Sequence, residues 1–285
     1  MSRLILILVG IGVLIGLLLI AMRTFGLDRY LRLMMTDITR LDQQISAPNS
    51  TPIFISLTTT PKRIPKIFET LKSLLDQSVK VDKIYVCIPY TFKRTGEPYQ
   101  VPELLLNLKS VEIVRCEDFG PGTKLLPILN IVSPDDKIIY LDDDNIYPYT
   151  LVETLVKKSD QYPNSALCVA GLKVNFDTFE TFKTVSKKDD FVDIVQGYGG
   201  VLVKPRFFSE KVYELNLAPK EARLSDDFWF SCNLDVCGVK RIKLGFDVKT
   251  LPFGTLNFFV GGLSRVPGGS DNDRKVLEYF YGERD

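Results

Sequence analysis

A short apolar run, Lys137 to Leu141, ends directly in three consecutive aspartates, residues 142–144. Such a run predicts a strand buried on both faces, as found at the centre of a parallel sheet covered by helices. Other β-rich runs alternate with helical patterns, beginning with a strand at 53–57 and a helix at 65–76. This alternation predicts βαβ units. The expected fold class is α/β, with a mostly parallel central sheet flanked by helices.

The same patterns predict the other elements of the domain. The expected strands are 83–88, 111–114, 166–174 and an extended segment at 192–203 that glycines interrupt. The expected helices are 124–130, 150–161 and 226–236, and beyond Pro252 there is little pattern until Lys275 to Tyr281.

Composition excludes several classes of function. The chain has 36 basic and 35 acidic residues, so no strong positive field attracts nucleic acid. It has no histidine, which excludes Ser-His-Asp and Cys-His nucleophilic sites and histidine-ligated zinc. A general acid or base must then be a carboxylate, lysine, tyrosine or cysteine. The five cysteines form no CxxC pair and indicate neither a disulfide framework nor a thiolate metal site.

The N-terminus predicts a single membrane-spanning anchor. After a short tail, residues 1–3, an uncharged run of about 19 residues at 4–22 is long enough to cross a hydrocarbon core. A cleaved signal peptide is the alternative, but Ala21-Met22-Arg23 is not a small-x-small cleavage site. We expect residues 23–50 to form a stem helix and linker, and residues 51–285 to form the folded domain.

The orientation of this anchor follows from its flanking charges. Four arginines follow the anchor closely and one precedes it, so the positive-inside bias favours a cytoplasmic domain. The unpaired cysteines agree with that side. A lumenal domain stays open, because Asn49-Ser50-Thr51 is formally a glycosylation sequon, although Pro52 follows it.

Three adjacent aspartates at a strand end point to a bound cation. Like charges so close raise one another's pKa, and a divalent ion relieves this. Asp142 and Asp144 point to the same side of an extended segment, so both can reach one ion. Oxygen ligands alone suit Mn²⁺ or Mg²⁺, with diphosphate oxygens and water completing the octahedron. The alternative is a solvated acidic turn.

The chain resembles GT-A glycosyltransferases of the family-2-like group, within the nucleotide-diphospho-sugar transferase superfamily. The resemblance covers about residues 52–250 and rests on four segments in the same order: Ile55 to Arg63, Asp118 to Leu125, Tyr140 to Pro148 and Ser225 to Trp229. It implies a glycosyltransferase that takes a nucleotide-diphosphate sugar donor and a glycan, lipid or protein acceptor. Many such enzymes with this layout are lumenal.

The resemblance also implies roles on the donor side. Residues Thr58 to Arg63 would lie at the carboxyl end of the first strand, where nucleotides bind in open α/β sheets, with Arg63 contacting base or phosphate. Asp118 would bond the base or ribose, and Lys124 the diphosphate. Further donor contacts would come from Gly122, Asp142 and Asp143. The segment from Gly120 to Lys124 is equally a turn that opens a helix, and it lacks the spacing of a Walker A loop.

Asp226-Asp227 matches the xED segment at a helix start, where inverting GT-A enzymes place the catalytic base. The resemblance makes Asp227 the base that takes the acceptor hydroxyl's proton, with Asp226 orienting the acceptor or the helix. The structural alternative is that Ser225 caps a helix whose first turn is acidic. A retaining mechanism stays open because the motif is short.

Tyr198-Gly199-Gly200 corresponds to the acceptor side of such sites, or marks only a β-bulge. Many GT-A enzymes add a metal ligand, often histidine, from the C-terminal region. Here Asp271 and Asp273 are the available substitutes, or water takes that position.

Two other functions compete with this interpretation. A haloacid-dehalogenase-like phosphatase needs DxDx[TV] on its first strand, whereas here Ile146 takes the fifth position and the motif follows a later strand. The second is a catalytically silent sugar-binding or scaffold protein of the membrane, built on the same fold. One sequence does not separate this alternative from an active enzyme.

Overall fold

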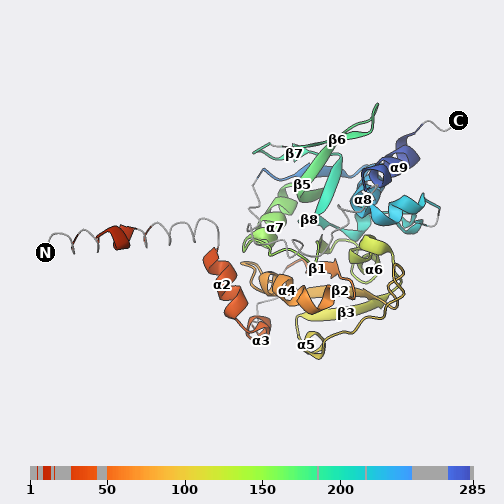
Figure 1. Cartoon of the computed structure of the whole chain (residues 1–285). Coiled ribbons are helices and arrows are strands. Elements are labelled where there is room, and N and C mark those ends of the chain that lie inside the picture. The colour runs from red at the N-terminus through yellow and green to blue at the C-terminus, as the bar shows by residue number, and fades with distance from the viewer. Residues whose placement is uncertain are drawn as a thin grey trace.

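The computed structural model describes residues 5, 9–13, 16, 27–43, 50–184, 186–215, 217–245 and 269–282. Their central element is a single mixed sheet that lies between two groups of helices (Figure 1). Its strands are β1 Ile53–Thr58, β2 Lys83–Pro89, β3 Val111–Cys116, β4 Lys137–Tyr140, β5 Ser165–Asn175, β6 Glu180–Lys183, β7 Asp190–Phe191, β8 Ile194–Val203 and β9 Lys240–Lys243.

The strands are ordered β3-β2-β1-β4-β8-β5-β9-β7, with β6 paired to β5. Strands β1 to β4 are parallel neighbours, which confirms the predicted βαβ pattern in this half. Strand β8 is antiparallel to both β4 and β5, so the sheet is mixed and not mostly parallel. The sequence does not reveal this direction, because a strand buried on both faces is a continuous apolar run whichever way it points.

The helices agree with most of the predicted positions. Predicted helices at 65–76, 150–161 and 226–236 are confirmed to within a few residues. The α-helices are α2 Leu27–Met35, α3 Ile38–Asp42, α4 Ile67–Leu75, α5 Glu103–Leu106, α6 Leu126–Leu129, α7 Leu151–Gln161, α8 Asp226–Val236 and α9 Gly269–Tyr281. Short 3-10 helices are η1 Ile64–Lys66, η2 Gly120–Lys124, η3 Pro205–Phe207, η4 Glu210–Tyr213 and η5 Lys220–Leu224.

The central strand β4 joins two apolar cores, one on each face of the sheet. Ile139 belongs to the core that α4 and α7 cover, and Ile138 and Tyr140 belong to the core under α6 and α8. This alternation is that of an extended chain. All of β4 is buried, as predicted for a central strand. The acidic residues 142–144 therefore follow at its carboxyl end, beside the end of β1.

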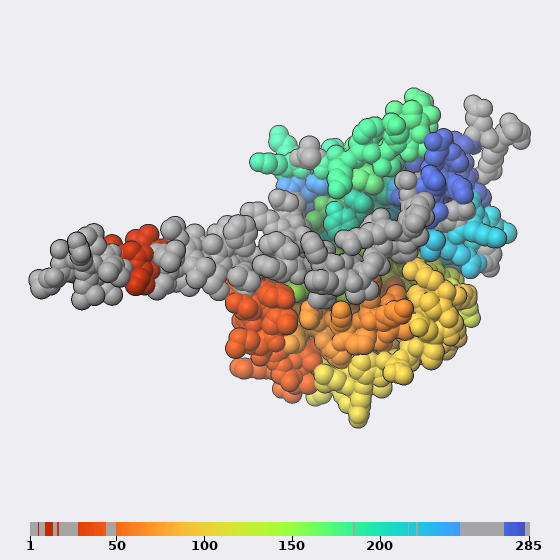
Figure 2. All heavy atoms as spheres, in the orientation of Figure 1, coloured from red at the N-terminus to blue at the C-terminus, as the bar shows by residue number. Residues whose placement is uncertain are grey.

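The segment that we expected to be a separate stem contributes two helices to the domain. The space-filling view in Figure 2 shows residues 27–43 directly against the chain that follows β1. Leu33, Ile38 and Leu41 are buried in the same core as α4. The Asp42 carboxylate accepts hydrogen bonds from the amides of Lys109 and Ser110, at 2.7 and 2.8 Å. Amphipathic helices pack in this way when a neighbouring apolar surface is available.

The predicted anchor at 4–22 lies for the most part outside the described residues. Within the residues that are described, none of the helices has both the length and the apolar character needed to cross a membrane.

Candidate active site

A buried lysine joins three of the predicted site residues. The Nζ atom of Lys124 lies 2.7 Å from Asp142 Oδ1, 2.9 Å from Asp226 Oδ2 and 4.0 Å from Asp227 Oδ1. The Lys124 side chain is only 5% exposed. Although burial opposes its charge, the three carboxylates together raise the pKa of Lys124 well above the usual value. Lys124 is therefore a fixed cation between the acidic motif after β4 and the start of α8.

The loop before Lys124 is held from both ends. The Asp118 carboxylate accepts hydrogen bonds from the amides of Gly120 and Lys93, each at 2.7 Å. Ser56 on β1 donates to the Lys124 carbonyl at 2.5 Å. Gly120 has φ +64°, and a Cβ there would clash with the carbonyl of Arg223, so this turn needs glycine. Asp118 thus orders the loop in this structure, and its predicted contact with base or ribose stays a prediction.

Two other predicted donor residues also have local partners. Thr58 Oγ1 donates to the Cys87 carbonyl at 2.8 Å and so ties the end of β1 to β2. Gly122 lies under the first turn of α8, where a Cβ would be 3.5 Å from the Phe230 ring and 3.9 Å from Asp226 Cβ. These are ordinary packing distances, so nothing in the geometry demands glycine at 122.

Asp227 lies at the start of α8 with its carboxylate turned towards β8. Its Oδ1 atom accepts a hydrogen bond from the Gly197 amide at 2.9 Å. Burial, together with the neighbouring charge of Asp226, raises the pKa of Asp227 to about 8. A carboxyl group with a raised pKa is a stronger base once it has lost its proton, as a general base requires. The predicted pair is therefore placed together, beside Lys124.

The alternative that Ser225 caps helix α8 is only partly supported. Helix α8 does begin at Asp226, directly after Ser225, but Ser225 makes no side-chain cap bond to it. Asp273 of α9 bonds the Ser225 side chain instead, and burial raises the pKa of Asp273 to about 6. Asp271 is exposed. Among the described residues, neither α9 aspartate belongs to a cluster of three or more metal-ligating side chains.

Arg63 pairs with the two later aspartates of the acidic motif. Its guanidinium binds both carboxylate oxygens of Asp143, with Nε at 3.1 Å from Oδ2, and reaches Asp144 Oδ2 at 3.3 Å. The Asp143 side chain is fully buried, so this pair braces the loop, and its predicted contact with the donor stays a prediction. The resemblance implied a contact of Arg63 with base or phosphate, and no local pattern predicts its pairing with Asp143 across 80 residues.

Asp142 and Asp144 are the predicted ligands of a cation. Both offer carboxylate oxygens, the ligands that Mg²⁺ and Mn²⁺ accept. In the described part of the chain no group of three or more acidic or cysteine side chains is arranged to hold a metal ion. Two carboxylates fit an ion that takes its other ligands from diphosphate and water. They do not form a closed cage, and each is already paired with a cationic side chain, Lys124 or Arg63.

Of the predicted acceptor segment, only Tyr198 is well exposed. Added Cβ atoms at Gly199 and Gly200 would contact Ala170 at 3.2 Å and Leu151 at 3.3 Å, so both glycines pack inside the domain. Gly200 has φ +92°, and the β5–β8 register shifts at this level. These observations describe a β-bulge.

Gly197 is the glycine that lines the site. A Cβ there would lie 2.5 Å from Lys124 Nζ and 3.2 Å from Asp227 Oδ1. Gly197 was not among the predicted site residues, because the bulge breaks the alternation that would show which glycine faces the lysine.

No protein-family model matches the chain, and no curated protein matches its sequence. Solved structures do resemble it. The structure of GalNAc-T7 with UDP, GalNAc and Mn²⁺ has a TM-score of 0.50 and 11% identity, and the match covers 73% of this chain and 48% of that one. S. aureus TarS in complex with UDP has a TM-score of 0.45 and 13% identity, with 69% of this chain and 59% of that one covered. The chain thus spans about half the length of the first of these. At such low identity the likeness concerns the fold, and this chain has the GT-A fold of nucleotide-sugar transferases.

Proposed function

We propose that this protein is a membrane-anchored glycosyltransferase that transfers a sugar from a nucleotide-diphosphate donor to an acceptor hydroxyl with inversion. One observation carries the proposal: Lys124 contacts both the acidic motif at the end of β4 and the aspartate pair at the start of α8. Open α/β sheets bind their ligands at the carboxyl ends of the strands, which is where these groups meet.

Asp227 is the proposed base. Its carboxylate takes the proton of the acceptor hydroxyl while that oxygen attacks the anomeric carbon from the face opposite the leaving group. The bond between that carbon and the phosphate oxygen breaks, and the nucleoside diphosphate leaves with the electron pair. The Gly197 amide, 2.9 Å from Asp227 Oδ1, holds the carboxylate in place. Asp226 pairs with Lys124 and fixes the helix start.

Lys124 is proposed to stabilise the leaving group. Its ammonium is buried and keeps its charge because its pKa is raised by surrounding carboxylates. A preorganised cation in a site shielded from water stabilises negative charge that develops in the transition state. Asp142 and Asp144 would hold Mn²⁺ or Mg²⁺, which would neutralise the diphosphate.

The donor and acceptor are proposed as classes. The donor is a nucleotide-diphosphate sugar, and UDP-sugars are the first to test, because the similar GalNAc-T7 structure holds UDP. The acceptor is a hydroxyl of a glycan, lipid or protein. Residues 4–22 are proposed to anchor the chain in a membrane, with the domain on the cytoplasmic side. Protease protection of sealed vesicles containing the full chain distinguishes this side from the lumenal one.

The test uses the full chain in detergent with a panel of nucleotide sugars, with and without Mn²⁺. We expect release of nucleoside diphosphate from at least one donor and its loss in Asp144→Ala. Asp177→Ala, which changes an exposed loop residue, is the control and should stay active. Donor binding without turnover across the panel would support the silent sugar-binding alternative, and absence of both binding and turnover would reject both functions.

A further inference from the structure

The Tyr147 side chain is hydrogen-bonded to the main chain of the acidic motif. Its hydroxyl accepts a hydrogen bond from the Asp142 amide and donates one to the Asp142 carbonyl, each at 3.0 Å. The Tyr147 side chain is 0% exposed and belongs to the core on the α4 side of the sheet. Its own amide donates to Ser73 Oγ on α4 at 3.0 Å. A buried ring whose hydroxyl both donates to and accepts from one residue fixes the position of that residue closely.

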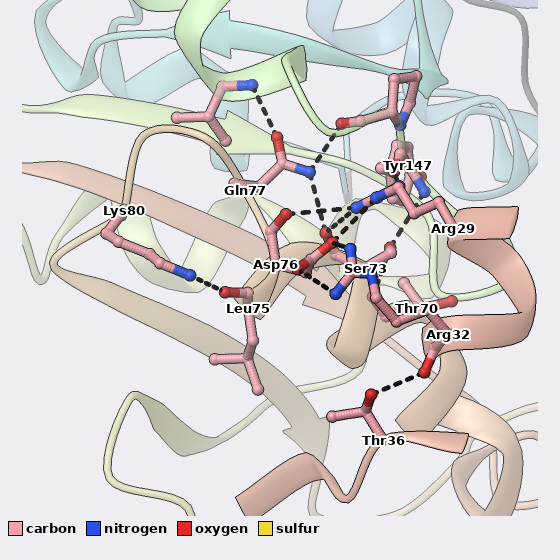
Figure 3. A network of polar contacts seen from close by, with 12 residues as sticks. Arg29, Arg32, Thr36, Thr70, Ser73, Leu75, Asp76, Gln77, Lys80 and Tyr147 are labelled. Carbon is pink, nitrogen blue, oxygen red and sulfur yellow. Dashed lines mark hydrogen bonds and ion pairs between the residues drawn. The ribbon is translucent and has the colours of Figure 1, made fainter. Parts of the chain in front are cut away.

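Arg29 of helix α2 lies beside Tyr147 and donates a hydrogen bond to its main chain (Figure 3). One guanidinium nitrogen donates to the Tyr147 carbonyl at 2.6 Å, and Nε pairs with Asp76 Oδ2 at 2.9 Å. A third bond reaches the Ser73 carbonyl at 3.2 Å. The Arg29 side chain is only 16% exposed. Arg29 thus joins α2, the end of α4 and the loop that carries the acidic motif.

Arg32 provides a comparison within the same helix. It pairs with both oxygens of Asp76, at 3.0 and 2.8 Å, so it shares the anchor point of Arg29. Within the part of the chain that the structure describes, Arg32 makes no hydrogen bond to Tyr147, and its side chain is 50% exposed. Both arginines attach α2 to Asp76, but only Arg29 also bonds Tyr147. A comparison of the two therefore distinguishes attachment of α2 from positioning of Tyr147.

We propose that Tyr147 is a positioning residue for the acidic motif and that Arg29 fixes it from α2, so that α2 supports nucleoside diphosphate binding. The part of this inference that concerns ligand binding rests on the proposed function. The mechanical part rests only on the chain of contacts from Arg29 through Tyr147 to Asp142. Helix α2 also follows the predicted anchor at 4–22 closely in sequence.

Tyr147→Phe tests the contact with Asp142, and Tyr140→Phe is its matched control. Both rings are fully buried and flank the acidic motif, but among the described residues the Tyr140 hydroxyl has no hydrogen-bond partner. In the full chain in detergent, we expect Tyr147→Phe to speed amide hydrogen exchange at Asp142 about tenfold, because that amide loses its acceptor. Tyr140→Phe should leave exchange at Asp142 unchanged.

Arg29→Gln and Arg32→Gln form the second pair. Both remove an ion pair with Asp76, so both should lower the melting temperature. Only Arg29→Gln should speed exchange at Asp142 and weaken the Kd for UDP with Mn²⁺, about tenfold, as Tyr147→Phe should. A Kd changed equally by the two arginine variants would reduce the role of Arg29 to attachment of α2.

These readouts separate failure of the inference from failure of the proposed function. If the wild-type chain binds no nucleoside diphosphate, the proposed function and the ligand-binding part fail together, and the exchange rates still decide the mechanical part. If exchange at Asp142 is the same in Tyr147→Phe and Tyr140→Phe, the positioning role is wrong. Faster exchange with an unchanged Kd would overturn the link to ligand binding. Should Tyr147→Phe not fold, the arginine pair alone decides.

Discussion

The Nζ atom of Lys124 lies 2.7 Å from Oδ1 of Asp142, so a buried ammonium neutralises the first residue of the acidic motif. The same ammonium also forms ion pairs with the two aspartates at the start of α8. Lys124→Met keeps the length of the side chain and removes its charge, which leaves these carboxylates without a counter-ion. We expect the free energy of unfolding at neutral pH to fall by about 3 kcal/mol in urea denaturation.

The loss in Lys124→Met should depend on pH with a definite sign. Lys124 lowers the pKa of Asp227, so without Lys124 this pKa rises further. The loss should therefore be largest above about pH 8, where Asp227 is charged, and should shrink as the pH falls and Asp227 protonates. Lys109→Met, at an exposed position, should change stability by less than about 0.5 kcal/mol. A loss in Lys124→Met that is independent of pH would show that packing, and not charge, is what Lys124 contributes.

Gly197→Ala should separate activity from stability. The added Cβ would meet the far end of the Lys124 side chain at 2.5 Å, and that end can move at little cost to folding. Moving it shifts the ammonium away from the carboxylates, and errors of this size in a catalytic site are costly. We expect the melting temperature to stay within a few degrees, while kcat falls at least about tenfold. A loss of thermal stability as marked as the loss of activity would mean that the Lys124 side chain does not move aside.

The pH dependence of transfer should report Asp227. A base must be unprotonated, and burial raises the pKa of Asp227 to about 8. We expect kcat/KM to rise with pH up to about 8 and then level off. The neighbouring charge of Asp226 contributes to this rise in pKa, so Asp226→Asn should move the profile to lower pH. A profile that Asp226→Asn leaves in place would assign the titration to another group.

Much of this fold could be predicted because its strongest signals are local. The apolar strand β4 and the acidic residues after it are adjacent in sequence, and helix α8 begins at Asp226 as predicted. Periodicity and turn chemistry act over a few residues, so one sequence reveals them.

The contacts that organise the site depend on pairing across the fold. Arg63 meets Asp143 across 80 residues, and Arg29 meets Tyr147 across 118. No local pattern encodes which charged side chains will face each other after folding. The face of the sheet on which Gly197 lies could not be predicted either, because a bulge in β8 shifts the alternation of side chains between the two faces. The packing of α2 and α3 was missed because their apolar residues also suit an isolated stem helix.

Metal binding should depend on the nucleotide. Asp142 and Asp144 are each paired with a protein cation, which competes with Mn²⁺ for their oxygens. Among the described residues, no cluster of three or more ligating side chains supplies a stronger site. We expect calorimetry to show weak Mn²⁺ binding to the chain alone and at least about tenfold tighter binding with UDP present, because diphosphate oxygens complete the coordination. Tight binding of Mn²⁺ without nucleotide would contradict this prediction.

Asp227→Asn should abolish transfer and yet stabilise the protein. The amide cannot accept the proton of the acceptor hydroxyl, so kcat should fall more than about a hundredfold. The donor Kd should stay within a few-fold, because the base acts in the transition state. Loss of donor binding would instead place Asp227 in the nucleotide site.

The stabilisation follows from the raised pKa of Asp227. The folded chain keeps a proton on Asp227 that the unfolded chain releases, so this carboxyl makes wild-type stability fall as the pH rises from about 4 to about 8. The side-chain amide of the variant does not ionise, so no buried charge destabilises the folded state. Its oxygen still accepts the hydrogen bond from the backbone amide of Gly197. Asp227→Asn should therefore be more stable than the wild type at pH 8 and about equally stable at pH 4. Asp271→Asn, at an exposed position on α9, should show no gain at either pH. A gain of the same size at both pH values would mean that relief of the buried charge is not its cause.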